Sequence, residues 1–87
     1  MKIRFHKSFL KSYDRLPKNI QSKAEERIKI FSNNQQDPRL KDHALQGKMA
    51  GKRAFSITGD YRIIYQRTNK GWTLLFIDIG THSQVYK

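Results

Sequence analysis

The chain has 87 residues, with 18 Lys and Arg against 7 Asp and Glu, and a formal net charge of +11. This length allows one domain, and we expect residues 1–87 to form it. The lack of cysteine excludes a disulfide scaffold, a cysteine-based zinc site and a thiol nucleophile. No segment approaches the ~20 apolar residues of a membrane helix, and no apolar signal-peptide core follows Met1. We therefore expect a basic cytoplasmic domain that has a polyanionic partner and does not bind membranes.

The first third of the chain predicts a strand and two helices. Ile3 and Phe5 alternate with polar residues, which is typical of a short strand over residues 2–6. Ser8 is placed to cap a first helix, and Pro17 suits the first turn of a second one. One face of the second helix carries Ile20, Ala24, Ile28 and Phe31. The polar stretch 32–38 ends in proline and should terminate this helix.

The second half of the chain has the alternating pattern of strands. We expect strands over residues 53–58, 61–65 and 72–79, joined by turns at Gly59–Asp60 and at residues 68–71. Residues 82–87 are expected to form a tail or a short edge strand. The element order β-α-α-β-β-β predicts an α+β domain, in which a helical hairpin backs a small antiparallel sheet.

A few side chains stand where functional groups tend to collect. His43 lies in an irregular stretch before the sheet, and His82 follows the last long strand. Asp60 and Arg62 lie at the start of a strand, where turn chemistry and a sheet-surface charge explain them equally well. His6 has no such context, and we expect it to be structural or solvated.

Together with the basic surface, these residue types fit the cleavage of RNA. The RNA 2′-hydroxyl is the nucleophile, so cleavage needs a base, an acid and cations around the reacting phosphate. Histidine, carboxylate and guanidinium groups supply all three without a metal. A zinc site is the competing use of two histidines and an aspartate, but no short ligand spacing such as H-x₃-H is present. We therefore expect neither a metal nor a cofactor.

Three segments resemble one known family. Residues 42–51, DHALQGKMAG, are similar to the DHxLxGxxxG segment of YafQ-type toxins. Residues 59–65, GDYRIIY, resemble the YRxxY strand of the wider RelE/ParE superfamily of bacterial type II toxin–antitoxin systems. Residues 80–86, GTHSQVY, resemble the C-terminal GxH element of that superfamily, which ends in an aromatic residue. The segments occur in the family's order, and the resemblance covers essentially the whole chain.

The resemblance implies a fold, an activity and a set of partners. The fold is that of RelE-like microbial RNases, a small antiparallel sheet backed by two N-terminal helices. The activity is cleavage of mRNA by a type II toxin, usually in the ribosomal A site. The implied partners are mRNA, the ribosome and a cognate antitoxin that neutralises the toxin. Operator DNA is contacted only through the toxin–antitoxin complex.

The resemblance also implies roles for five catalytic residues. His43 matches the first active-site histidine, Asp60 the acidic base or proton relay, and His82 the general acid. Arg62 matches an arginine that binds the scissile phosphate in RelE- and YoeB-like relatives and that YafQ-type toxins often lack. Tyr86 matches the terminal aromatic residue, which stacks on a base or assists proton transfer.

One position departs from the YafQ-type pattern. These toxins carry a second histidine on the strand before the Gly-Asp turn, where this chain has Ser56, which is not a useful base near pH 7. Either the charge of Arg62, Lys52 or Arg53 compensates for the missing histidine, or the activity is reduced. The residues expected along the RNA phosphates are Lys48, Lys52, Arg53 and Ser56.

Two other functions are open to a chain of this kind. A ParE-like poison of DNA gyrase would share the fold without needing the histidines, and the five residues together argue against it. A non-catalytic binding module or operator corepressor is kept open by Ser56. His82→Ala separates these functions, because it should abolish the toxicity of a nuclease and leave gyrase poisoning or pure binding largely intact.

Overall fold

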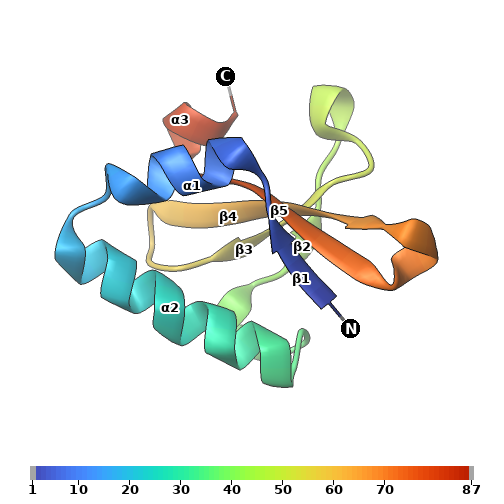
Figure 1. Cartoon of the computed structure of the whole chain (residues 1–87), viewed down its shortest axis with the longest axis horizontal. Helices are drawn as coiled ribbons and strands as arrows, with labels where there is room; N and C mark the ends of the chain where they lie inside the picture. Colours follow the sequence, from blue (N-terminus) through green and yellow to red (C-terminus); the bar gives the residue numbers. More distant parts are fainter. Residues whose placement is uncertain (1, 87) are drawn as a thin grey trace.

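A five-stranded sheet in the order β1-β5-β4-β3-β2 forms the centre of the structure, a computed structural model that describes residues 2–86 (Figure 1). The strands are β1 (Lys2–Phe5), β2 (His43–Ala44), β3 (Arg53–Ser56), β4 (Tyr61–Thr68) and β5 (Thr73–Thr81). Strands β2 to β5 pair antiparallel, whereas β1 pairs parallel to β5 at the sheet edge. The predicted α+β fold is confirmed, with this one parallel pair added to the antiparallel meander.

The helices differ in length and in the part of the sheet that they cover. They are α1 (Lys7–Asp14), α2 (Lys18–Asn33) and α3 (His82–Val85), and short 3₁₀ turns form η1 (Pro38–Leu40), η2 (Gly47–Met49) and η3 (Asn69–Gly71). In Figure 1, α1 and α2 lie in front of the sheet, and α3 follows β5 near the C-terminal end. Among residues 2–86, no helix has the length and apolar character needed to cross a membrane.

The main core lies between the sheet and the two N-terminal helices. Ala24 and Phe31 of α2 are fully buried, as the helical periodicity predicts. The Phe31 ring stacks on Phe55 with 4.5 Å between ring centroids, and meets the Tyr65 ring edge-on at 5.0 Å. Aromatic pairs of this geometry add to the free energy of burial. The core therefore locks α2 onto β3 and β4.

The opposite face of the sheet carries a smaller apolar cluster. Ala54 of β3 and Ile64 of β4 pack there against Val85 of α3. Successive side chains of a strand point to opposite faces, so Ser56 and Arg62 share this face with Ala54 and Ile64. Among residues 2–86, the side chains that pack on this cluster come from α3, from Tyr86 and from the segment around η2, which is little cover and leaves room for a site.

Two local predictions are wrong, each for a clear reason. The N-cap of α1 is His6 and not Ser8, because the His6 Nδ1 accepts a hydrogen bond of 3.0 Å from the Ser8 backbone N–H. Residues 82–85 form α3 instead of a tail or edge strand. Thr81 and Gln84 form a capping box, in which each side chain bonds the other residue's backbone N–H. Residue 87 of the expected tail lies outside the described residues.

Candidate active site

A groove of about 350 Å³ opens on the sheet face opposite α1 and α2. It brings together four of the five predicted catalytic residues, from β2, β4 and the α3 segment: His43, Arg62, His82 and Tyr86. Leu45 and Met49 add an apolar wall. Among the described residues, no carboxylate lines this groove. The groove therefore suits an anion with an attached planar or apolar part.

Tyr86 connects two of the polar groups. The ring of His82 meets the Tyr86 ring edge-on, with 4.5 Å between the centroids. The guanidinium carbon of Arg62 lies 5.6 Å from the centroid of the same ring. A cation over an aromatic face is attracted by the ring quadrupole. Tyr86 thus holds an imidazole and a guanidinium next to each other at one end of the groove.

The hydrogen bond of His43 determines which of its nitrogens can act as a base. Nδ1 of His43 lies 3.0 Å from the backbone carbonyl oxygen of Lys41. A carbonyl oxygen only accepts, so Nδ1 carries the proton. The neutral ring then has its lone pair on Nε2, which makes the exposed His43 side chain a ready proton acceptor.

Two polar atoms at this site are buried without a partner among residues 2–86: Nε of Arg62 and Oη of Tyr86. A buried donor without an acceptor costs free energy, so such atoms are uncommon in folded proteins. A phosphate supplies several acceptor oxygens at once, and a guanidinium matches its geometry. Because the Arg62 side chain lines this groove together with His82, a phosphate is a ligand that the groove fits.

Asp42 anchors the chain just before His43. Its carboxylate accepts hydrogen bonds from the Tyr65 hydroxyl at 2.8 and 2.9 Å, and its Oδ1 lies 3.4 Å from Nε of Arg53. Tyr65 is fully buried in the main core. Burial, together with the hydrogen bond to Asp42, raises the pKa of Tyr65 to about 12. The core thus fixes the position from which His43 enters the groove.

This network predicts a specific alkaline sensitivity. Because the Tyr65 pKa is about 12 in the folded state against 10.0 for the free side chain, its contribution to stability is complete below pH 10. It is lost as the pH rises through 12. In Tyr65→Phe, the free energy of unfolding should therefore depend less on pH between pH 10 and 12, as measured by urea unfolding. Tyr13, whose pKa is also raised to about 12 by burial and by Glu25, should retain part of the dependence. An unchanged dependence in Tyr65→Phe would contradict the network.

The capping box gives a second prediction, for the order of α3. Loss of a Thr cap costs about 0.5–2 kcal/mol, and the Tyr86 backbone N–H, which bonds the His82 carbonyl, reports on it. Thr81→Ala should speed hydrogen exchange at this amide by roughly tenfold, and Thr81→Ser should restore the slow exchange. Equal exchange in Thr81→Ala and the unmodified chain would mean that the cap does not hold α3.

Other predicted site residues lie elsewhere. Asp60 is exposed in the turn between β3 and β4, and it is not among the residues that line the groove. Lys48 is exposed on η2, and Lys52 precedes β3, so both flank the groove without lining it. Arg53 is held by Asp42. Ser56 pairs with Arg62 across β3 and β4 and lines a neighbouring groove.

Several features of the site were not expected from the sequence. Strand β2 could not be predicted from periodicity, because it is only two residues long. The sequence also did not indicate the apolar wall of Leu45 and Met49 or the anchoring role of Asp42. Within residues 2–86, no group of three or more His, Cys, Asp or Glu side chains is placed to hold a metal ion.

The comparisons with known proteins identify the family. All of residues 1–87 match the family described as "Bacterial toxin of type II toxin-antitoxin system, YafQ". No curated protein sequence matches the chain. The crystal structure of YafQ from E. coli BL21(DE3) is similar, with a TM-score of 0.82 and 26% identity over 99% of this chain and 98% of that one.

Two further structures agree with this match. YafQ in the E. coli DinJ–YafQ toxin–antitoxin complex has a TM-score of 0.78 and 27% identity, over 99% of this chain and 97% of that one. The YoeB/ParE toxin from Agrobacterium tumefaciens has a TM-score of 0.77 and 25% identity, over 94% of this chain and 99% of that one. With the match over its full length, the chain belongs to the YafQ family of bacterial type II toxins.

Proposed function

We propose that this toxin is a ribosome-dependent endoribonuclease that cleaves mRNA by metal-independent acid–base catalysis. The observation that carries the proposal is the groove in which His43, Arg62, His82 and Tyr86 meet without a carboxylate among the described residues. These groups supply a base, an acid and a cation, which are the three requirements of attack by a 2′-hydroxyl.

The base is His43 in this mechanism. Nε2 of its neutral ring takes the proton of the 2′-hydroxyl, because Nδ1 already donates to the Lys41 carbonyl. The 2′-oxygen then forms a bond to phosphorus. Asp60 was the other candidate base, but its place outside the groove favours His43. Asp60, in the exposed turn before β4, takes no direct part in this mechanism.

The acid is His82, and the cation is Arg62. As the bond between phosphorus and the 5′-oxygen breaks, His82 donates a proton to that oxygen, which leaves as a 5′-hydroxyl. The other product ends in a 2′,3′-cyclic phosphate, so atoms and protons balance. Arg62 stabilises the extra negative charge of the pentavalent phosphate. Tyr86 positions His82 and Arg62 through its ring.

The remaining basic residues serve binding. Lys48 and Lys52 flank the groove and contact more distant phosphates, whereas Arg53 acts mainly through Asp42. Ser56 adds a hydroxyl next to Arg62 and supplies no base. The groove is an open surface feature, so a large assembly that holds the mRNA in place would complete it. The ribosome is such an assembly, and a net charge of +11 favours its binding.

The biological setting follows the family. Residues 1–87 act as one toxin domain in the bacterial cytoplasm, where a cognate antitoxin neutralises it. The E. coli complex of YafQ with DinJ supports this partner class. Operator DNA is bound only through the toxin–antitoxin complex.

Primer extension on mRNA held in translating ribosomes tests the function. The purified toxin should produce new 5′ ends on ribosome-bound mRNA and few on the same RNA free in solution. His82→Gln should remove these ends. Ser83→Ala, which changes an exposed neighbour on α3, is the matched control and should keep them.

Two outcomes would contradict the proposed function or the proposed acid. If a batch that arrests growth produced no new 5′ ends, the nuclease function would be rejected in favour of gyrase poisoning, which a DNA supercoiling assay would detect. If His82→Gln cleaved like the unmodified toxin, the assignment of the acid would fail.

A further inference from the structure

A second groove, of about 450 Å³, adjoins the candidate active site. It lies where α2, η1 and the turn after β3 meet, and its polar lining includes Arg27, Arg39, Lys41, His43, Ser56 and Arg62. His43 and Arg62 line both grooves, so the two form one continuous surface. Among the described residues, no carboxylate lines the second groove.

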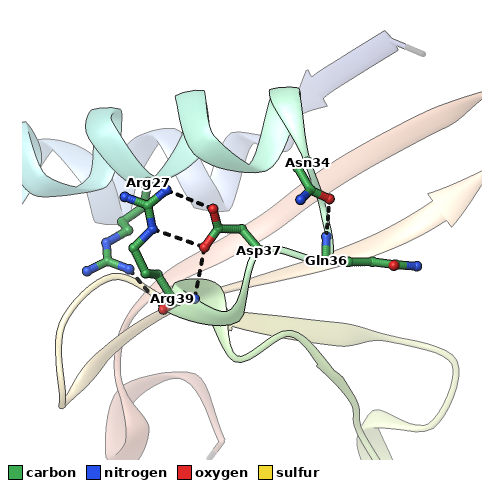
Figure 2. Close-up of polar contacts among 5 residues, drawn as sticks. All are labelled: Arg27, Asn34, Gln36, Asp37 and Arg39. Atoms are coloured by element: carbon green, nitrogen blue, oxygen red, sulfur yellow. Dashed lines mark hydrogen bonds and ion pairs between the residues drawn. The ribbon is translucent and has the colours of Figure 1, made fainter.

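A hydrogen bond to the backbone of η1 holds the Arg27 side chain in place. Its Nη1 donates a hydrogen bond of 2.8 Å to the backbone carbonyl oxygen of Arg39, so the side chain spans from α2 to η1 (Figure 2). The Nε of Arg27 is buried without a partner among residues 2–86, as is the Nε of Arg62. Arg27 from α2 and Arg62 from β4 therefore place two guanidinium groups along one groove.

The charge of Arg39 is already compensated. Its guanidinium donates to both carboxylate oxygens of Asp37, at 3.0 and 2.7 Å (Figure 2). These hydrogen bonds lower the pKa of Asp37 to about 2, and the charge of Arg27 makes a smaller contribution. The excess positive charge of the groove therefore belongs to Arg27, Lys41 and Arg62.

Lys41, the residue directly after η1, adds a further positive charge to the same groove. It adopts a left-handed backbone conformation with φ of 50°, which is uncommon for a residue other than glycine. This turn directs the chain from η1 into β2, and the Lys41 carbonyl oxygen bonds His43. Strained backbone is often retained at functional sites. The same residue thus lines the second groove and orients the proposed base.

We propose that the second groove binds the RNA phosphate adjacent to the scissile one, with Arg27 as its principal ligand and Lys41 as a second cation. This inference rests on the proposed function, since the first groove then holds the scissile phosphate. Consecutive phosphates of one strand would lie on either side of the Arg62 side chain. The planar fork of Arg27 suits a phosphate better than an ammonium does. Two fixed phosphates would set the register of the strand, so that the intended 2′-hydroxyl faces His43.

The test uses oligonucleotides that cannot be cleaved. A 2′-O-methyl dinucleotide has one internucleotide phosphate, and the trinucleotide has two. NMR titrations at low ionic strength give the dissociation constants. The unmodified toxin should bind the trinucleotide about tenfold more tightly. The Nε–H resonance of Arg27 should shift with the trinucleotide and much less with the dinucleotide.

Variants distinguish a defined phosphate site from non-specific electrostatic attraction between the oligonucleotide and the basic protein. Arg27→Gln should abolish the preference for the trinucleotide, and Arg27→Lys should retain only part of it. Lys29→Gln removes the same charge from an exposed position of α2 and should keep the preference. Lys41→Asn, a change that suits the left-handed backbone, should reduce it without removing the bond between Arg27 and Arg39.

The possible results are distinct. Equal affinities of the unmodified toxin for the two oligonucleotides would overturn the subsite, as would an equal loss in Lys29→Gln and Arg27→Gln. Because the probes are not cleaved, these results do not depend on catalysis. Cleavage on ribosomes without a trinucleotide preference would reject the subsite alone. A preference that depends on Arg27, without any cleavage, would keep the phosphate site and reject the proposed nuclease.

Discussion

His82→Gln should lower the rate of mRNA cleavage by about 10²- to 10⁴-fold, the usual contribution of a positioned general acid. Glutamine retains polarity and approximate size, but it cannot donate a proton to the leaving 5′-oxygen at neutral pH. His82 is exposed, and its ring contacts the ring of Tyr86. The melting temperature should therefore stay nearly unchanged. Single-turnover cleavage of ribosome-bound mRNA, with thermal unfolding measured on the same samples, gives both quantities.

Arg62→Ala should reduce the same rate by about 10²- to 10³-fold, as the loss of one charge-stabilising donor does elsewhere. Arg62→Lys keeps the charge and should recover part of the loss, because its ammonium cannot reproduce the guanidinium fork. A folded double variant of His82 and Arg62 that still cleaves at the original rate would disprove the site.

Phe31→Ala should lower the free energy of unfolding by about 3–5 kcal/mol, the range for truncation of a buried phenylalanine. Phe31 is fully buried, and it contacts the rings of Phe55, Tyr65 and Phe76. Total stability of small domains is about 5–15 kcal/mol, so the variant would lose a large share of it. Urea unfolding followed by circular dichroism measures the change.

Lys29→Ala is the matched control for Phe31→Ala, because Lys29 is exposed on the same helix. Its effect should be within about 0.5 kcal/mol. Phe31→Ala protein that remains folded below its melting temperature should still cleave, since Phe31 lies on the face of the sheet opposite the groove. A loss of activity without a loss of stability would contradict this division of the two faces.

Much of the fold could be predicted, because long elements carry a strong period. The face of α2 that contains Ala24 and Phe31 is buried as expected, and the meander of β3, β4 and β5 follows from its alternation and turns. Short elements contain too few residues to show a helical or strand periodicity. Strand β2 has two residues and is defined by pairing with β3, a contact that no local sequence signal reports. Helix α3 did have a local signal, the spacing of Thr81 and Gln84 in a capping box.

The site was predictable by residue type more than by position. His43, Arg62, His82 and Tyr86 come together because β2, β4 and α3 meet on one face. Asp60 precedes β4 by one residue, yet a turn directs it away from the lining of the groove. Arg27 could not have been singled out, since it is one of many cations and only the position of η1 brings it to the second groove.

The parallel pairing of β1 with β5 has a consequence for newly made toxin. Residues Lys2 to Phe5 pair with Thr73 to Phe76, so β1 cannot join the sheet before β5 has been synthesised. His82 and Tyr86 follow directly after β5. The groove therefore cannot assemble before β5 and the α3 segment have been synthesised, although its other residues, His43 and Arg62, are made earlier.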